Sequence, residues 1–343
     1  MQKDNLNITI LGVGAIGGVI GAYLVKGGYN VTFLDVNEEH VQKMKQDGLT
    51  IKMKDDTFTV PVDAYTVDEF KEKNQKLQAV FLAVKAQHTE SAVKSISGLL
   101  NPDGYIVSFQ NGLNEDTIAK EVGRERTVGC FVNLFADYME PGVIQYGGVG
   151  SLYIGELDGE DSERVNQLIQ ALQYWGDAKK TNNIFGFLWS KLAYGAILTA
   201  SATSNVTIAD FIDSEQYRPL VIALGQEVLQ VAGKKGITPE FFDDWEPNYV
   251  FPELQEDKLD QQFSILVNRL RGYTKTRTGI WRDLAVRKRK TEVPQQLNPI
   301  IAEGESCGFS MTLLKTLLAL ITEIENGERE MSEDNLQLLI DKI

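Results

Sequence analysis

The chain has 343 residues, of which 43% are hydrophobic and 24% charged; the length suggests two domains, and the composition is that of a soluble globular protein rather than a collagen-like, disordered or membrane-spanning one. The formal net charge of -14 argues against a nucleic-acid partner, because proteins that bind phosphate backbones normally present a basic face. Cys130 and Cys307 stand far apart without metal-ligand spacing, so we expect no metal, reduced thiols and a cytoplasmic location.

From residue 7 onward, short apolar runs alternate with helical patterns, which predicts a parallel sheet covered by helices. Glycines interrupt the first apolar stretch, and no later run reaches the about 18 apolar residues of a membrane helix, so no membrane partner is expected. Strands are predicted at 7–11, 30–34, 79–84 and 105–109, helices at 15–26 and near 90–100, and an antiparallel hairpin at 142–146 and 151–155.

After residue 185 nearly every periodic stretch has helical spacing, apart from a proline- and aromatic-rich loop at 238–254. We therefore expect a boundary near 180–184, with an α/β domain over 1–183 and an all-α domain over 184–343. The apolar run at 313–324 suits either a homodimer interface or an internal core.

A glycine-rich turn directly follows the first predicted strand and opens the first predicted helix. It has the pattern GxGxxG, in which the glycines make a tight turn, let the backbone approach a pyrophosphate, and pack helix against strand. The turn consists of Gly12, Val13, Gly14, Ala15, Ile16 and Gly17. Asp35 ends the second strand, 18 residues after Gly17, where an acid recognises ribose hydroxyls. We favour a dinucleotide site over a plain turn, and NAD(H) over NADP(H), because a carboxylate repels a 2′-phosphate.

The chain has 2 histidines, His40 and His88, and both are interpreted as surface or helix-start residues rather than proton donors. Lys191 lies in the apolar stretch 185–198, where burial would lower its pKa toward that of a general acid. A lysine that snorkels from the helix edge explains the same pattern equally well. Helical spacing places Gly195 and Thr199 on the same face as Lys191.

Two further polar positions follow predicted parallel strands. Lys85 ends the strand at 79–84, and Asn111 follows the strand at 105–109. Ligands of open α/β sheets bind at the carboxyl ends of such strands, although a solvated lysine and an ordinary Asn-Gly turn would give the same pattern.

Five motifs together resemble the ketopantoate reductase (2-dehydropantoate 2-reductase) family, in order and spacing along nearly the whole chain. These are Gly12–Gly17, Val84-Lys85-Ala86, Gln110-Asn111-Gly112, Leu188-Trp189-Ser190-Lys191-Leu192 and Lys290-Thr291-Glu292. The resemblance implies an N-terminal Rossmann-type domain, a helical C-terminal domain and a site in the cleft between them.

The resemblance also assigns roles to single residues. It implies that Lys191 protonates or polarises the 2-oxo group while hydride reaches the carbon, and that Asn111 lies near nicotinamide and substrate. It further implies that Lys85 is a cleft lysine, and that Glu292 reaches the nicotinamide end of the cofactor and helps to set the charge of Lys191. Local sequence alone would leave Glu292 as a solvated helix end.

Departures from the family pattern concern substrate and cofactor choice. Gly195 and Thr199 stand where pantoate-forming members usually carry substrate-binding asparagines. Asp35 stands near the end of the second strand, where many members carry the basic residue with which they bind NADPH. NADP(H) remains compatible with the resemblance, whereas Asp35 favours NAD(H).

Our main interpretation is a reductase of a small 2-oxo acid, with 2-dehydropantoate as the leading substrate. One alternative is an NAD-dependent D-2-hydroxyacid dehydrogenase for branched or aromatic 2-oxo acids, which Gly195, Thr199 and Asp35 favour. Another is a non-catalytic NAD(H)-binding regulatory protein, against which the presence of Lys191 and Glu292 argues.

Overall fold

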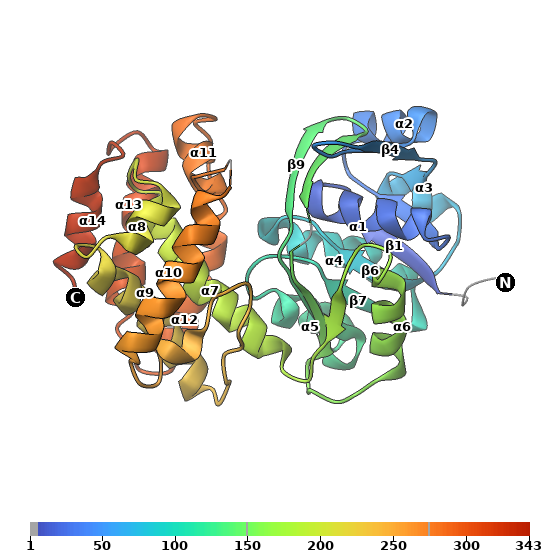
Figure 1. Ribbon diagram of the computed structural model, residues 1–343. Helices are drawn as coiled ribbons and strands as arrows, with labels where there is room; N and C mark the ends of the chain where they lie inside the picture. Colours follow the sequence, from blue (N-terminus) through green and yellow to red (C-terminus); the bar gives the residue numbers. More distant parts are fainter. Residues whose placement is uncertain (1–5, 149, 274) are drawn as a thin grey trace. The chain divides into compact units, whose positions relative to one another are not determined.

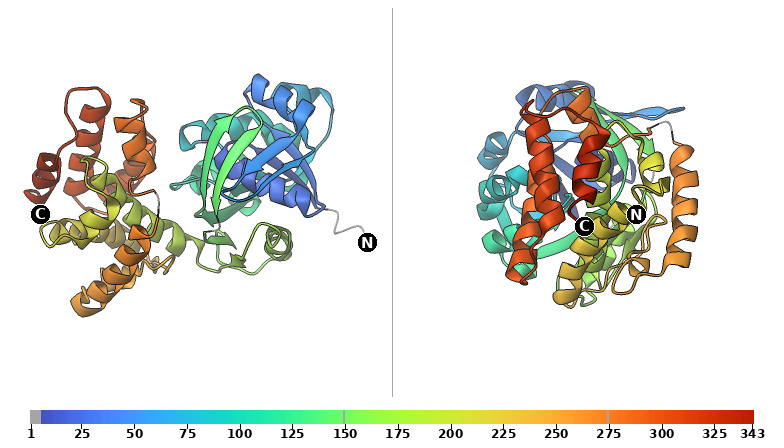
Figure 2. Two further views of the ribbon diagram at one scale, coloured as in Figure 1. Left: turned by 45° about the horizontal axis from the view of Figure 1, so that its top comes forward. Right: turned by 90° about the vertical axis from the view of Figure 1, so that its left-hand side faces the viewer.

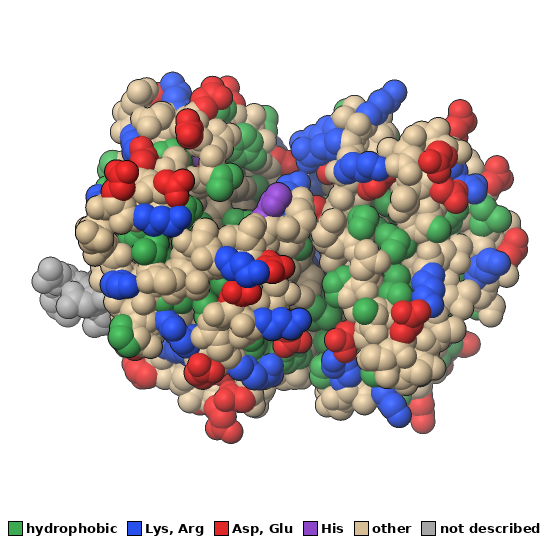
Figure 3. Space-filling view, turned by 180° about the vertical axis from the view of Figure 1, so that it is seen from behind, with side chains coloured by type: hydrophobic (Ala, Val, Ile, Leu, Met, Phe, Trp, Pro, Cys, Tyr) green, Lys and Arg blue, Asp and Glu red, His purple; other side chains and the backbone are tan. Residues whose placement is uncertain are grey.

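The structure is a computed structural model that describes residues 6–148, 150–273 and 275–343. The chain forms two compact units, an N-terminal domain that ends at Ile184 and a C-terminal domain that begins at Phe185 (Figure 1). Figure 3 shows acidic and basic side chains interspersed over most of the face that it presents.

Within the described residues, the larger sheet of the N-terminal domain contains eight strands. Their order is β12 (Ala178–Lys180), β11 (Leu152–Glu156), β8 (Thr127–Val132), β7 (Leu100–Ser108), β6 (Leu77–Leu82), β1 (Asn7–Leu11), β2 (Asn30–Leu34) and β5 (Asp63–Tyr65). The strands from β8 to β5 are mutually parallel, whereas β11 is antiparallel to β8. The N-terminal helices are α1 (Ala15–Lys26), α2 (Glu38–Asp47), α3 (Val67–Glu72), α4 (Thr89–Ile96), α5 (Glu115–Val122) and α6 (Glu163–Leu172).

Both faces of this sheet are buried, which explains why its central strands are continuous apolar runs. Alternate residues enter different cores: Phe81 and Val107 join the cluster on the α1 side, and Val80, Leu82 and Ile106 join the cluster on the other side. The expected α/β domain with a parallel sheet and an all-α domain after it is thus confirmed.

The hairpin predicted at 142–146 and 151–155 is wrong, because its two strands lie in different sheets. β10 (Val143–Gly148) belongs to a smaller sheet of order β4 (Thr57–Val60), β3 (Leu49–Lys52), β10 and β9 (Phe135–Glu140). β10 pairs with β9 across the turn Pro141-Gly142, where Gly142 has φ +77°, and packs on α1 (Figure 2). The almost fully buried β11 instead lies in the larger sheet, between β8 and β12.

Two predicted strands have shifted ends. β6 ends at Leu82 rather than at residue 84, and β7 begins at Leu100 rather than at residue 105. The glycine turn lies against the chain after β6, since a Cβ built on Gly12 would come within 2.7 Å of Val84 Cγ1. Val84 therefore lies in the loop after β6, packed against the glycine turn.

The C-terminal domain consists of helices in its described residues, as expected. They are α7 (Ile184–Ser201), α8 (Ile208–Asp213), α9 (Arg218–Lys234), α10 (Glu256–Arg271), α11 (Gly279–Ala285), α12 (Val293–Ser306), α13 (Thr312–Glu325) and α14 (Glu333–Ile340). α7 is long and apolar enough to cross a membrane, but 72% of it is buried inside the protein, as in the core helix of a globular domain. Leucines of α13 are likewise buried, so the apolar run at 313–324 contributes to an internal core.

Candidate functional site

The carboxyl ends of four neighbouring parallel strands bring the N-terminal candidates together. The strand order reverses at β1, which has β2 on one side and β6 on the other. Leu11 pairs in register with Leu34 and Leu82, and Leu82 pairs with Ser108. The loops after β2, β1, β6 and β7 therefore share one edge, at the reversal point where open α/β sheets bind ligands.

The three glycines of the turn have three different environments. Gly12 has φ +94° and donates its N–H to the Leu34 carbonyl at 2.8 Å. A Cβ on Gly17 would lie 2.3 Å from the Gly12 carbonyl oxygen, whereas a Cβ on Gly14 would meet no atom within 4 Å. Gly12 thus makes the turn, Gly17 allows helix and strand to pack, and Gly14 leaves its backbone open to a ligand.

The open backbone at Gly14 begins a helix of 12 residues, α1. The first turn of α1 contains no acidic side chain, and Gly14 occupies the N-cap position. The N–H groups at a helix N-terminus, together with the helix dipole, attract phosphate. The residues present thus fit a dinucleotide pyrophosphate.

Asp35 lies beside this turn and is fixed by two backbone amides. Its Oδ2 accepts a hydrogen bond from Val13 N–H at 2.7 Å, and its Oδ1 accepts one from Asn37 N–H at 2.9 Å. A carboxylate has about four lone-pair directions, so the carboxylate can accept two further hydrogen bonds. Asn37 also caps α2 by accepting from His40 N–H at 3.1 Å, which stabilises the loop.

His40 lies in the first turn of α2, in agreement with the helix-start interpretation, but it is not at the surface, because this residue is 1% exposed. Its Nε2 lies 2.9 Å from the Val13 carbonyl oxygen, and Gly142 N–H donates to its Nδ1 at 2.9 Å. Both partners are backbone groups, which the side-chain pattern of the sequence does not reveal. His88, in contrast, is exposed at the N-cap of α4, in agreement with the sequence interpretation.

A buried polar network that sequence reasoning missed connects the loops of Lys85 and Asn111. Gln110 Nε2 donates to the Val84 carbonyl and to Thr89 Oγ1, at 2.8 Å each. Asn114 Nδ2 donates to the Asn111 carbonyl at 2.8 Å. Lys85 and Asn111 themselves are exposed, so buried neighbours hold the loops that carry them. A glutamine at the end of an apolar strand was the available signal for this network.

Glu115 extends this network into the protein interior. It begins α5, is 1% exposed, and accepts Asn114 N–H on Oε2 at 3.0 Å. Burial raises the pKa of Glu115 to about 7, against an ordinary value of 4.5. The carboxyl group therefore titrates near neutrality, directly behind the Asn111 loop.

In the C-terminal domain, α7 carries the lysine face. Lys191 is half-buried, and a Cβ on Gly195 would meet no atom within 4 Å. Thr199 is buried and donates its hydroxyl hydrogen to the Gly195 carbonyl at 2.8 Å. The face therefore offers open space one helical turn after the lysine, while the Thr199 hydroxyl is bonded to the helix itself.

Glu292 stands at the N-cap position of α12 and is half-buried. The preceding residue is firmly held, because Thr291 donates its N–H at 2.7 Å and its hydroxyl at 2.5 Å to Glu325 Oε1. The Glu325 side chain is 3% exposed. A buried carboxylate on α13 therefore fixes the backbone from which Glu292 projects.

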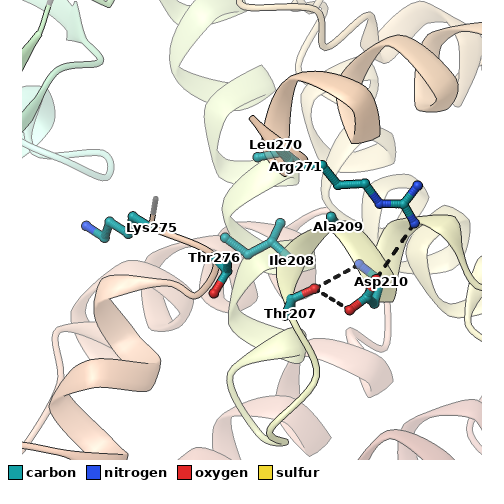
Figure 4. Close-up of a pocket in the computed structure, with 8 residues that line it drawn as sticks. All are labelled: Thr207, Ile208, Ala209, Asp210, Leu270, Arg271, Lys275 and Thr276. Atoms are coloured by element: carbon teal, nitrogen blue, oxygen red, sulfur yellow. Dashed lines mark hydrogen bonds and ion pairs between the residues drawn. The ribbon is translucent and has the colours of Figure 1, made fainter. Parts of the chain in front are cut away.

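A separate cavity of about 200 Å³ lies where the start of α8 meets the end of α10 (Figure 4). Three of its polar side chains, Thr207, Asp210 and Arg271, interact with each other: Thr207 caps α8 and donates to Asp210 Oδ2 at 2.6 Å. Arg271 lies 3.8 Å from Asp210 and 2.6 Å from Asp213. These groups stabilise the helix ends, and none of the predicted site residues lines the cavity.

The fold and the glycine turn define a two-domain protein with a dinucleotide-binding α/β domain. Residues 8–159 match the family model of ketopantoate reductase PanE/ApbA, and residues 183–325 match the model of the C-terminal part of that family. The chain belongs to the ketopantoate reductase family and is a nicotinamide-dependent oxidoreductase that acts on CH–OH groups.

Relatives support the same family over most of the chain. The chain is 24% identical to the 2-dehydropantoate 2-reductase of Archaeoglobus fulgidus over 323 residues, which cover 93% of this chain and 98% of that protein. It is 34% identical to the 2-dehydropantoate 2-reductase of a Nostoc species, over 43% of this chain and 45% of that protein.

Solved structures share the fold. A 2-dehydropantoate 2-reductase from Geobacter metallireducens has a TM-score of 0.77 at 23% identity, covering 93% of this chain and 99% of that one. A D-mandelate dehydrogenase in complex with NADH and anilino(oxo)acetate has a TM-score of 0.78 at 21% identity, and the match covers 94% of this chain and 99% of that one.

Proposed function

We propose that the protein is a cytoplasmic enzyme that reduces 2-dehydropantoate to pantoate with NADH. The observation that carries this proposal is the match of both halves of the chain to the ketopantoate reductase family models, with Lys191 retained in the motif that bears the family's proton donor. In this proposal residues 1–183 bind the cofactor, and residues 184–343 supply the catalytic lysine and select the substrate.

Bound nicotinamide supplies the hydride that reaches C2 of the 2-oxo acid. Lys191 gives a proton to the 2-oxo oxygen, which lowers the cost of the developing negative charge there. Lys191 is half-buried on the apolar helix α7. Glu292 helps to set the charge of that lysine, and Asn111 orients the reacting groups.

The proposed cofactor groups of the N-terminal domain are Gly12, Val13, Gly14, Ala15, Ile16, Gly17, Asp35, Lys85 and Asn111. NADH is preferred because the Asp35 carboxylate, held by two backbone amides, would lie beside a 2′-phosphate and repel it.

The cofactor proposal is tested with Asp35→Asn. The amide keeps one acceptor oxygen but loses the charge, so the ratio of kcat/KM with NADH to that with NADPH should fall about tenfold, which corresponds to ~1.4 kcal/mol. If Asp35 only stabilises the turn, the substitution would weaken the binding of NADH and NADPH equally and leave the ratio of their kcat/KM values unchanged. An unchanged ratio would therefore assign Asp35 to the turn alone.

A second substrate class is favoured by one observation, the open space beside Gly195. Family members that form pantoate usually have an asparagine here, which holds the substrate's hydroxyl and carboxylate. In its place, this chain leaves room for a substrate with a larger side chain. The fold neighbour with NADH and anilino(oxo)acetate is a D-mandelate dehydrogenase, which agrees with an aromatic 2-oxo acid as the alternative substrate.

A substrate panel distinguishes the two. Oxidation of NADH and NADPH is followed with 2-dehydropantoate, 2-oxoisovalerate and phenylpyruvate. We expect the highest kcat/KM with 2-dehydropantoate and NADH. A higher value with 2-oxoisovalerate or phenylpyruvate would establish the D-2-hydroxyacid dehydrogenase instead, and no turnover with any of them would contradict both.

A further inference from the structure

We propose that His40 is a positioning residue for cofactor binding: its neutral imidazole holds the Val13 carbonyl and thereby aims the Gly14 N–H at the pyrophosphate. This inference rests on the proposed dinucleotide site. It adds to that site a side chain outside the glycine turn and outside the ribose-binding strand end.

The two peptide groups of Val13 are held from different directions. Its N–H donates to Asp35 Oδ2 at 2.7 Å, which fixes the Gly12–Val13 peptide. Its carbonyl oxygen lies 2.9 Å from His40 Nε2, which fixes the Val13–Gly14 peptide. Because a trans peptide is planar and its C=O and N–H point in opposite directions, the bond to the carbonyl also determines where the Gly14 N–H points.

The direction of that N–H matters because Gly14 is the open position of the turn. No atom lies within 4 Å of where its Cβ would be, so a ligand has access to this part of the backbone. A peptide held on one side only could rotate, and ordering it would then reduce the affinity for the ligand. His40 removes that freedom before the cofactor arrives.

The hydrogen bonds also determine which form of His40 is present. Gly142 N–H donates to Nδ1 at 2.9 Å, so Nδ1 carries no proton. Nε2 must then carry the proton, and it donates to the Val13 carbonyl. Gly142 lies in the turn between β9 and β10, 102 residues from His40, so the smaller sheet sets the tautomer that holds the nucleotide turn.

Two substitutions separate the two bonds. In His40→Gln the amide nitrogen can reach the Val13 carbonyl, as Nε2 does, while the bond from Gly142 is lost. In His40→Asn the shorter side chain can accept from Gly142, as Nδ1 does, while the bond to Val13 is lost. The Kd for NADH, the KM for NADH, kcat and the Tm are measured for both variants.

Loss of one hydrogen bond in the turn should raise the Kd and KM for NADH of His40→Asn by up to about tenfold, while kcat at saturating NADH changes little. His40→Gln should restore the affinity to within about twofold of the wild type, even if its Tm falls. Val41→Ala is the control: it removes a buried side chain from the same helix, so it should lower the Tm without changing the Kd.

Equal NADH affinity in wild type and His40→Asn would overturn the inference and leave His40 as a core residue. Equal weakening in the Gln and Asn variants would overturn it as well, because the bond to Val13 would then not be the one that matters. Binding of NADH and NADPH to the wild-type protein is measured first. If it binds neither cofactor, the proposed function itself fails, independently of the His40 variants.

Discussion

The Gly12–Gly17 turn and the lysine face of α7 differ in what determines them. In the turn, main-chain geometry decides each position: a positive φ at Gly12, a close contact at Gly17 and open space at Gly14. On α7, the side chains determine the properties of the lysine face, and Gly195, which has no side chain, leaves open space beside Lys191. A substitution in the turn therefore acts through the backbone, whereas a substitution at Gly195 adds a side chain to open space on an otherwise unchanged helix.

The largest expected effect falls on the α7 face. Lys191→Ala should lower kcat by about 10²- to 10⁴-fold, the usual contribution of a general acid, and leave the Kd for NADH unchanged. Lys191→Arg is the control, since arginine keeps the positive charge but does not release a proton near neutral pH. Full turnover in Lys191→Arg would show that charge alone suffices there.

The next effect concerns the buried network of the N-terminal domain. Burial raises the pKa of Glu115 from an ordinary value of 4.5 to about 7. Between pH 4.5 and about pH 7, the folded protein therefore keeps the carboxyl proton that the unfolded chain has released. The contribution of Glu115 to stability is therefore greatest below pH 4.5 and falls as the pH rises to about 7, by about 2–3 kcal/mol.

Glu115→Gln removes this titration. Urea unfolding of both proteins at about pH 5 and about pH 8 should show that the wild type loses more free energy of unfolding with rising pH than the variant does. Parallel changes in the two proteins would mean that the carboxyl group is already ionised throughout this range.

A matched pair of glycine substitutions tests the turn itself. Gly17→Ala places a methyl group against the Gly12 carbonyl and should destabilise the fold by about 1–3 kcal/mol. Gly14→Ala meets no neighbour and has an ordinary φ of -76°, so its Tm should stay near that of the wild type while its Kd for NADH rises about tenfold. Unchanged NADH affinity in Gly14→Ala would place the pyrophosphate elsewhere.

The smallest effect is expected at Gly195. Gly195→Asn adds an amide one turn after Lys191, and a single new hydrogen bond should raise kcat/KM for 2-dehydropantoate relative to phenylpyruvate by about three- to tenfold. Gly195→Ala, whose methyl group enters open space, controls for the gain in helix propensity. Equal ratios in the two variants would exclude position 195 from substrate contact.

The fold could be predicted where glycines lie at the ends of an apolar run. The limits of β1, α1 and β2 agree residue for residue with the sequence prediction. The smaller sheet was not predicted, because strands such as β4 and β9 are half-exposed and show no continuous apolar run. The turn Pro141-Gly142 was the signal that would have paired β10 with β9.

For the site, the glycine turn and Asp35 could be predicted because their spacing is local. The bonding partners of Gln110 and His40 could not, since only the fold brings the backbone of Val84, Val13 and Gly142 near these side chains. Such contacts depend on main-chain position, to which residue type gives no direct guide. The role of Lys191 was predicted from its apolar surroundings together with the family resemblance, that of Glu292 from the resemblance alone, and both stay predictions.

The most direct test of the proposed reaction follows the hydride itself. NADH with deuterium on one face of nicotinamide C4 and NADH with deuterium on the other face are incubated separately with 2-dehydropantoate and the enzyme, and the products are analysed by mass spectrometry and NMR. We expect one deuterium at C2 of pantoate with one of the two labelled cofactors and none with the other. Oxidation of the cofactor with no deuterium at C2 from either of them, or the absence of pantoate, would contradict the proposed function.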